Sequence, residues 1–540
     1  MMGTEADVAA TPGPDEASRL SVLRARLVAP MPADRPWGWL GPLLVTAFGA
    51  FLRFSRLSSP DAIVFDETYY AKDAWSILQH GVEWNPVGNA NALIIAGHTN
   101  IFQPCPGGGC AEYVVQPEVG KELIAIGEWL FGLNTFGWRF SSAVFGSLAI
   151  LLICRIARRM TRSTLLGCIA GLLMSLDGLE FVLSRTGILD IFLMFFILAA
   201  FGCLVIDRDK SRARLAEGVA RGAGGEAGPR LGLRKWQVAC GIILGLAVGT
   251  KWIAVWYIIG YALLFIAWEI GARRTAGLRS FVRGAFREAV WLPLTFIVIP
   301  LVVYTATWTN WLVTSTGFYR NYGQLNGVTT PVISALYSLY EYHLQAITFG
   351  LGLRTPHPYQ SQPWDWLLIT RPVAFFYEQY SGPVAGPQYY CPAKGCTGQY
   401  WSQEVLAIGT PLIWWSSIVA LVFCLGWWLL HRDWRAGAVL MGVLAGWGPW
   451  FPLVTRTKFY YYALEFEPFL ILSIVLCLGL ILGPVTASVR RRSIGAGVVG
   501  AYVLAVLIMF WYFYPIVAGK VIPYPDWLSH MWYRVGHGWI

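Results

Sequence analysis

Residues 37–57 have the sequence WGWLGPLLVTAFGAFLRFSRL, an apolar stretch that contains no acidic residue. About 20 apolar residues are enough for a helix to cross the hydrocarbon core, where lipid offers no partner for backbone hydrogen bonds. The preceding residues 1–36 include several acids and no apolar stretch, which argues against a cleavable signal peptide. We therefore expect segment 37–57 to remain as a membrane anchor behind an N-terminal tail.

The composition extends this expectation to the whole chain. Of the 540 residues, 56% are hydrophobic and 13% are charged, about half the charged fraction of a soluble domain. These figures exclude soluble, disordered and fibrous classes. Ten further apolar stretches follow the first, so the sequence predicts an all-α polytopic membrane protein with about eleven transmembrane helices. The eleven segments are 37–57, 137–155, 165–183, 187–206, 236–250, 252–270, 289–308, 408–430, 436–454, 463–486 and 494–515.

The distribution of basic residues predicts the topology, because Lys and Arg accumulate in cytoplasmic loops. With residues 1–36 in the cytoplasm, most of the 41 Lys and Arg residues fall in short cytoplasmic segments, including the linker 207–235. Two long loops, 58–136 and 309–407, and the tail 517–540 then lie outside. Basic residues in short turns beside anionic lipid headgroups give no support to nucleic-acid binding.

Four of the ten cysteines form two compact pairs in the outer loops, Cys105 with Cys110 and Cys391 with Cys396. We expect both pairs to be disulfides in an oxidising compartment. A zinc site is the alternative, but it favours closer spacing and often histidine, which neither loop contains. The other six cysteines fall in or beside apolar segments and are interpreted as packing residues.

Charged residues gather in the outer loops and at the outer ends of the apolar segments. Such groups are costly near the membrane unless they are paired or functional. The sequence has no phosphate-binding GxxxxGK[ST] loop and no HExxH motif. Because nucleotide sugars and ATP are unavailable outside the membrane, group transfer there requires a lipid-carried donor. A polyprenyl phosphate sugar fits, since its phosphate needs Arg or Lys and its tail needs an apolar groove.

The segment 64–75, VFDETYYAKDAW, combines two adjacent carboxylates with interfacial aromatic residues. It is compatible with a helix that Asp66 caps and whose first turn carries Glu67. It is equally compatible with a catalytic carboxylate that accepts a proton from an acceptor hydroxyl. The sequence alone leaves both interpretations open.

An ordered set of motifs resembles the protein O-mannosyltransferase family of the GT-C class of membrane glycosyltransferases. Its elements run from about residue 50 to the C-terminus: Arg53 with 59–67 (SPDAIVFDE), 116–121 (QPEVGK), 138–140 (WRF), Ser184-Arg185 with Leu189-Asp190, 244–252 (LGLAVGTKW), 357–364 (HPYQSQPW) and 456–462 (RTKFYYY). Gln116 and Glu118 replace the family's His and second Pro. The second outer loop has no room for a sugar-binding repeat domain. The resemblance therefore implies a bacterial, actinobacterial-type member with a GT-C fold.

The resemblance also implies roles for individual residues. Asp66 would be the general base, and Glu67 would orient the acceptor or the sugar. The donor phosphate would be bound by Arg53, Arg139, Arg185, Lys251, Arg456 and Lys458. Sugar or acceptor contacts would come from Lys121, Gln116, His357, Tyr359 and Tyr461. Arg53 and Arg139 could instead order the catalytic loop. Structural alternatives are snorkelling anchors for Arg53 and Arg139, a pairing with Asp190 for Arg185, and a purely structural role for His357.

The function implied is an inverting transfer of mannose from polyprenyl-phosphate-mannose to Ser/Thr hydroxyls of secreted polypeptides. It would take place at the outer face of a bacterial plasma membrane, among membrane lipids and with the translocon as a candidate partner. No Asp-x-Asp motif lies beside the base, so no metal and no cofactor are expected. A glycolipid or cell-wall glycan acceptor is one alternative. A lipid or sugar transporter is another, although its usual internal repeats are missing.

Overall fold

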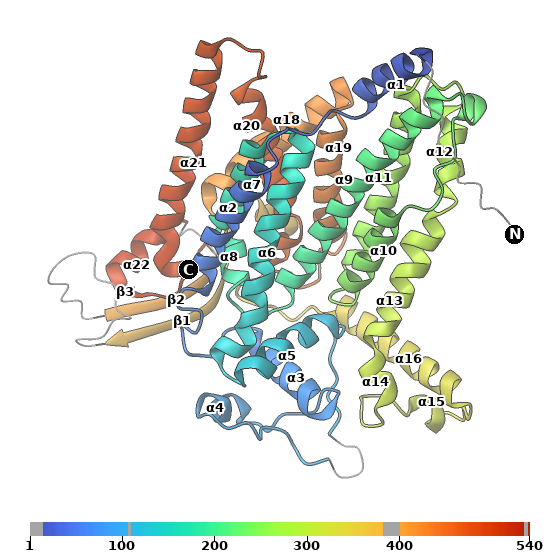
Figure 1. Ribbon diagram of the computed structural model, residues 1–540. Coiled ribbons are helices and arrows are strands. Elements are labelled where there is room, and N and C mark those ends of the chain that lie inside the picture. Colours follow the sequence, from blue (N-terminus) through green and yellow to red (C-terminus); the bar gives the residue numbers. More distant parts are fainter. Residues whose placement is uncertain (1–13, 106–109, 382–399, 534–537, 540) are drawn as a thin grey trace, which may run out of the picture.

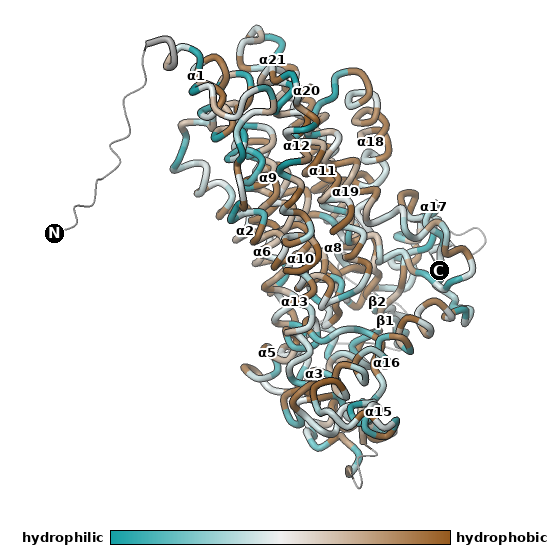
Figure 2. Tube along the Cα trace, turned by 90° about the vertical axis from the view of Figure 1, so that its right-hand side faces the viewer, coloured by the Kyte–Doolittle hydropathy of each residue, from teal (hydrophilic) through white to brown (hydrophobic). Residues whose placement is uncertain are grey.

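The computed structural model describes residues 14–105, 110–381, 400–533 and 538–539 (Figure 1). The predicted pair Cys391–Cys396 lies outside these residues. Cys105 and Cys110 form the predicted disulfide in the loop 58–136. Apolar residues run along the middle of a helical bundle, and polar residues gather at its ends (Figure 2).

Helices occupy all eleven predicted apolar segments. They are α2 (Trp37–Phe54), α6 (Thr135–Thr161), α7 (Thr164–Ser175) with α8 (Gly178–Leu183), α9 (Asp190–Ala220), α10 (Lys235–Val248), α11 (Ala254–Thr275), α12 (Phe281–Ala289) continuing through a π-helical stretch (Pro293–Val298) into α13 (Ile299–Thr307), α18 (Pro411–His431), α19 (Trp434–Trp447), α20 (Glu467–Leu482) and α21 (Val489–Val517). In the described part of the chain, seven helices are long and apolar enough to cross a membrane, and α7, α10 and α20 are shorter apolar helices. The number of eleven crossings therefore stays a prediction.

The predicted segment 165–183 is interrupted at Asp177, which is fully buried between α7 and α8. Its Oδ1 accepts hydrogen bonds from the backbone N–H groups of Leu179 and Glu180 and so caps α8. Its Oδ2 accepts from the indole of Trp414 at 2.9 Å and from the backbone of Thr410 at 3.1 Å. These partners satisfy a carboxylate that is buried inside the bundle, and they join α8 to the start of α18.

The two long loops that the sequence predicts to lie outside the membrane are largely structured. The first contains α3 (Glu67–His80), α4 (Ala90–Ile95) and α5 (Val119–Phe131), and the second contains α14 (Thr309–Val313), α15 (Tyr322–Leu325), α16 (Pro331–Gly352) and α17 (Pro363–Trp366). Both lie at the same end of the bundle, the lower end in Figure 1. At the other end, α1 (Pro14–Leu27) packs against α9, which continues through the first half of the predicted linker 207–235.

A small antiparallel sheet was not predicted from the sequence. It consists of β1 (Val373–Ser381), β2 (Tyr400–Ala407) and β3 (Val521–Pro523), in the order β1-β2-β3. The short helix α22 (Tyr524–His530) follows β3. The register shifts between Ala374 and Phe376, so Phe375 is an extra residue in β1. The sheet joins the second outer loop to the C-terminal tail beside the bundle.

Candidate functional site

Asp66 lies on a strained turn immediately before α3. The preceding residue, Phe65, has a φ of +47°, a left-handed conformation that non-glycine residues rarely adopt. Its ring stacks on Phe375 of β1, with centroids 4.5 Å apart, and meets Tyr461 edge-on at 5.5 Å. These aromatic contacts hold the turn that directs the next side chain.

The Asp66 side chain makes no capping hydrogen bond to α3, so the capping interpretation does not describe its contacts. The hydroxyl of Tyr461 donates to its Oδ2 at 3.4 Å. Burial raises the pKa of Asp66 to about 6, and the nearby charge of Asp190 adds to the rise, while Lys251 and the Tyr461 hydroxyl oppose it. A carboxylate with this pKa is ionised at neutral pH and is a stronger proton acceptor than an ordinary aspartate.

Glu67, in contrast, is fully buried and saturated with hydrogen bonds. Both of its oxygens accept from the guanidinium of Arg139, at 2.7 and 2.9 Å, and one also accepts from the backbone N–H of Gly187. The other accepts from the backbone N–H of Val64. The remaining N–H groups of Arg139 donate to the carbonyls of Leu57, Pro60 and Ala62. All five guanidinium donors are thus engaged in holding segment 57–67, which leaves none for a phosphate.

Two further predicted phosphate ligands, Arg53 and Arg185, form ion pairs or hydrogen bonds with other parts of the protein. Arg53 is buried in the bundle, where it forms an ion pair with Glu180 and donates to the carbonyl of Gly49. Arg185 donates to four carbonyls at the end of α2, at residues Leu52, Arg53, Ser55 and Arg56. It caps the orphan carbonyls of that helix. The alternative role of Arg185, a pairing with Asp190, is not formed either, because Asp190 pairs with Lys251 at 2.8 Å.

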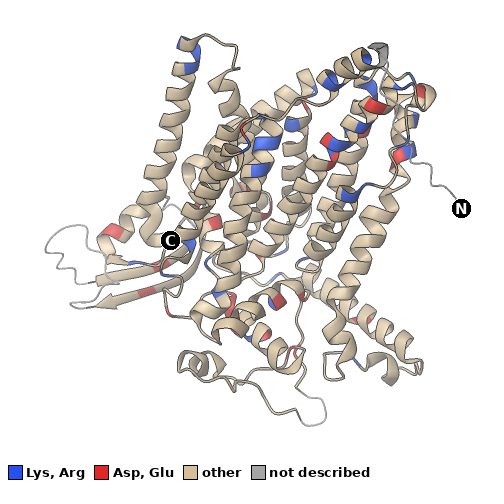
Figure 3. Ribbon diagram, viewed as in Figure 1, with Lys and Arg blue, Asp and Glu red and all other residues tan. Residues whose placement is uncertain are grey.

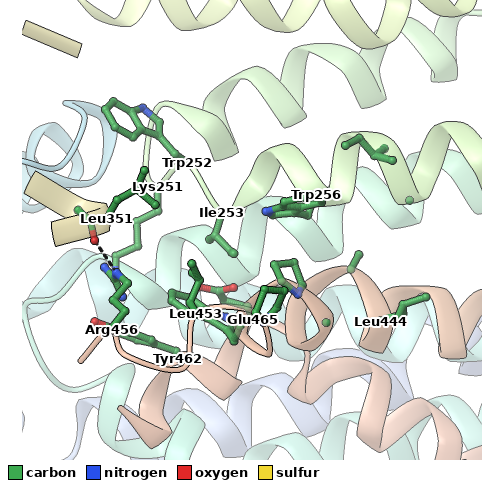
Figure 4. A pocket seen from close by; sticks show the side chains of 18 of the residues that line it. Lys251, Trp252, Ile253, Trp256, Leu351, Leu444, Leu453, Arg456, Tyr462 and Glu465 are labelled. Carbon is green, nitrogen blue, oxygen red and sulfur yellow. Dashed lines mark hydrogen bonds between the residues drawn. The ribbon is translucent and has the colours of Figure 1, made fainter. Parts of the chain in front are cut away.

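A cavity of about 830 Å³ lies between α11, α19 and α16. Its walls are mainly apolar and come from residues such as Ile259, Leu263, Ile347, Met441 and Leu444. Figure 4 shows Lys251 and Arg456 together at one end of this cavity and Leu444 toward the other. Trp252, Trp256 and Tyr462 add aromatic surface along it. The cavity thus combines a cationic end with a long apolar continuation.

Of the three remaining predicted phosphate ligands, two line this cavity and one does not. Lys251 and Arg456 line it, and Arg456 donates through Nε to the carbonyl of Gly350 at the end of α16, at 2.7 Å. Lys458 does not line it; its ammonium group is bonded to the carbonyls of Leu453 and Val454. Lys251 also lies over the ring of Tyr462, at 5.5 Å from its centroid. Two cations therefore line the cavity: Arg456, and Lys251, whose ammonium group also pairs with Asp190.

The predicted sugar or acceptor residues are spread over a wider region. Gln116 lines the cavity, and Tyr461 contacts Asp66. Lys121 is fully buried elsewhere, in ion pairs with Glu83 and with Glu118 at 3.2 Å. His357 and Tyr359 lie in a surface segment, where the His357 ring packs edge-on against Phe459 at 5.0 Å. The structure does not bring Lys121 to the cavity.

Sequence reasoning missed Glu465, whose carboxylate lies on the cavity wall with one oxygen that has no hydrogen-bond partner. The sequence did contain a signal for this residue, because an acidic side chain inside the predicted span 463–486 is costly unless it is paired or functional. Among the described residues, no group of three or more His, Cys, Asp and Glu side chains is arranged to hold a metal ion.

Comparisons with known proteins agree over most of the chain. A family model described as dolichyl-phosphate-mannose-protein mannosyltransferase matches residues 43–312, and one described as the C-terminal four TMM region of protein-O-mannosyltransferase matches residues 335–535. A polyprenol-phosphate-mannose–protein mannosyltransferase of Mycolicibacterium smegmatis (strain MKD8) is 38% identical over 516 residues, which cover 93% of each chain. The protein of that name from Corynebacterium glutamicum is 32% identical and covers 91% of this chain and 92% of the relative.

A solved structure shows the same fold. The S. cerevisiae protein O-mannosyltransferase Pmt1–Pmt2 complex bound to the sugar donor matches with a TM-score of 0.68 at 15% identity. The match covers 99% of this chain and 96% of the other. At this level of identity the match speaks for the fold and not for the ligand.

Proposed function

Because this chain belongs to the dolichyl-phosphate-mannose-protein mannosyltransferase family, we propose that it transfers mannose from a polyprenyl-phosphate-mannose donor to Ser/Thr hydroxyls of secreted polypeptides. The chain is a glycosyltransferase, and its fold is the expected GT-C fold. One observation carries the specific proposal: a long apolar cavity has two cations at one end, and one of them, Lys251, interacts electrostatically with the carboxylate of Asp66, which retains its capacity to accept hydrogen bonds.

The cavity fits the two parts of such a donor. A phosphate at the cationic end would lie between Lys251 and Arg456, where charge-assisted hydrogen bonds are strongest. The polyprenyl tail would follow the apolar walls between α11 and α19, which match its hydrocarbon surface. Arg456 would then exchange its bond to the Gly350 carbonyl for a bond to the phosphate.

Asp66 would serve as the general base. The acceptor hydroxyl loses its proton to the Asp66 carboxylate while its oxygen forms a bond to the anomeric carbon of the sugar. The bond from that carbon to the phosphate oxygen breaks, and the electron pair leaves with the polyprenyl phosphate, whose charge Lys251 and Arg456 neutralise. A single displacement inverts the anomeric carbon and turns a β-linked donor into an α-linked mannoside. We propose that this requires no metal, because the two cations already serve the leaving group.

A transfer assay tests the proposal directly. The purified protein in nanodiscs is given radiolabelled polyprenyl-phosphate-mannose and a Thr-containing peptide, beside the Asp66→Asn variant. Removal of a general base is expected to lower the rate by about 10²–10⁴-fold. Wild-type protein that binds donor but labels only a glycolipid or glycan would disprove the polypeptide acceptor. An unimpaired variant would disprove the role of Asp66, and loss of wild-type activity with a chelator would disprove metal independence alone.

A further inference from the structure

The strand β1 has β2 on one side and, within the described part of the chain, no strand on the other. It is nine residues long, from Val373 to Ser381, and Tyr377, Glu378 and Gln379 are exposed. A strand of this length extends for roughly 30 Å. Such an edge presents backbone N–H and C=O groups to any extended chain that lies alongside it.

The inner end of β1 is tied to the turn that carries Asp66. The bulge at Phe375 directs that buried ring onto Phe65, the neighbour of Asp66, with centroids 4.5 Å apart. The same ring meets Tyr461 edge-on at 5.5 Å, and the hydroxyl of Tyr461 donates to Asp66. Bulges commonly re-aim side chains beside active sites. Through this one ring, the strand contacts both the neighbour of the proposed base and the tyrosine that bonds to it.

We propose that β1 is the docking edge for the acceptor polypeptide, which adds to the sheet as a further strand and so presents a Ser or Thr hydroxyl to Asp66. This inference rests on the proposed function and names how its acceptor is held. Lipid tails have no groups to pair with a strand edge, whereas an unfolded polypeptide has them at every residue except proline. Strand addition gives affinity through the main chain, so one site accepts many sequences. Threonine also favours extended backbone.

The experiment uses the full-length protein in nanodiscs, without donor, and a fluorescent nine-residue peptide with one central Thr flanked by Ala and Val. Two matched peptides carry N-methyl groups, one at positions −3, −1, +1 and +3 from the Thr and the other at −4, −2, +2 and +4. In an added strand, alternate N–H groups point toward the sheet. One methylated peptide should therefore bind at least about tenfold more weakly than the parent, and the other should bind nearly as well.

Equal binding by the three peptides would overturn the proposal, as would the absence of binding by the unmodified peptide. The same peptides are then tested for mannose transfer. Mannose transfer to the peptides, without a difference in binding between the two methylated peptides, would support the proposed function and disprove strand addition. A difference in binding between the two methylated peptides, without mannose transfer to any of the three, would support strand addition and disprove mannosylation of polypeptides.

A pair of protein variants provides a second readout. Glu378→Pro and Gln379→Pro change neighbouring exposed positions, whose N–H groups point to opposite sides of the strand. Proline at an edge position whose N–H faces outward is tolerated, whereas proline on the inner side breaks the β1–β2 ladder. The variant that keeps the wild-type melting temperature should bind the unmodified peptide at least about tenfold more weakly. Wild-type binding by that variant would contradict the proposal.

Discussion

Two adjacent carboxylates in this chain have different contacts and, we infer, different tasks. Glu67 accepts hydrogen bonds from Arg139 and from two backbone N–H groups, and it is fully buried. Asp66 has one long hydrogen bond, from Tyr461, and its side chain is partly exposed. A base must be able to accept a new proton, and only Asp66 of the two retains that capacity.

The pH profile should report the protonation of Asp66. Its pKa is raised to about 6, so the rate of transfer should fall as the pH is lowered through about 6, because a protonated carboxyl cannot accept the hydroxyl proton. Tyr461→Phe keeps the ring and removes the hydroxyl that lowers this pKa. The midpoint of the profile of kcat against pH should therefore move upward. A midpoint that is unchanged in Tyr461→Phe would show that another group controls the profile.

The ion pair between Glu67 and Arg139 should be a stability element. Glu67→Gln leaves the buried guanidinium without its counter-charge, which costs about 3–5 kcal/mol in buried pairs and should lower the melting temperature measured by intrinsic fluorescence. Glu217→Gln breaks the exposed pair with Arg24 and is the matched control, with an expected cost of at most about 1 kcal/mol. Equal shifts in the two variants would contradict this assignment.

The residues alone could not separate Asp66 from Glu67, and only the family resemblance gave the two acids different roles, because the difference in their contacts arises from residues far along the chain. Arg139 and the backbone of Gly187 donate hydrogen bonds to the carboxylate of Glu67, and the hydroxyl of Tyr461 donates to that of Asp66. The motif placed both acids correctly at the start of a helix. It could not show which of them is saturated, since that depends on how α6, α8 and the segment before α20 pack around them.

At the scale of elements, the cavity distinguishes Arg456, which lines it, from Lys458, which does not, although both have the same role in the prediction from the sequence. Arg456→Gln should raise the KM for the lipid donor by roughly 10- to 100-fold, because it removes a charged donor to the phosphate, and it should leave the KM for the acceptor peptide unchanged. Lys458→Gln is the control, since Lys458 bonds only to nearby carbonyls among its described partners. Initial rates over a donor titration measure both. A larger rise in the donor KM in Lys458→Gln than in Arg456→Gln would show that the phosphate binds outside the cavity.

The helices were predictable from the sequence and the sheet was not, for a physical reason. An apolar helix satisfies its own backbone, so hydropathy within a window of about 20 residues is sufficient evidence. A strand is completed by its partner, and β2 pairs with residues 521–523, more than a hundred positions away. The break at Asp177 was visible as an acid in an apolar segment, but its partners Thr410 and Trp414 lie on α18 and its N-terminal boundary.

Over the whole molecule, charge and hydropathy define two different ends. Lys and Arg concentrate at the end of the bundle near α1, opposite the outer loops that carry α3 and α16 (Figure 3). Positive residues mark the cytoplasmic side of a membrane protein. This distribution supports the prediction that the N-terminal segment is cytoplasmic. We propose accordingly that Asp66 and the cationic end of the cavity lie toward the outside, where a lipid-carried donor is required.

Labelling of introduced cysteines tests this orientation. Gly88, in the first outer loop, and Ser18, on α1, are both exposed, and a side chain at Gly88 would meet no neighbouring atom. In intact cells, a membrane-impermeant maleimide should label Gly88→Cys and should not label Ser18→Cys until the membrane is permeabilised. The wild-type chain provides the background, because its six described free cysteines are buried or partly buried. The reverse pattern would place Asp66 in the cytoplasm, where nucleotide sugars are available, and the argument for a lipid-carried donor would lose its basis.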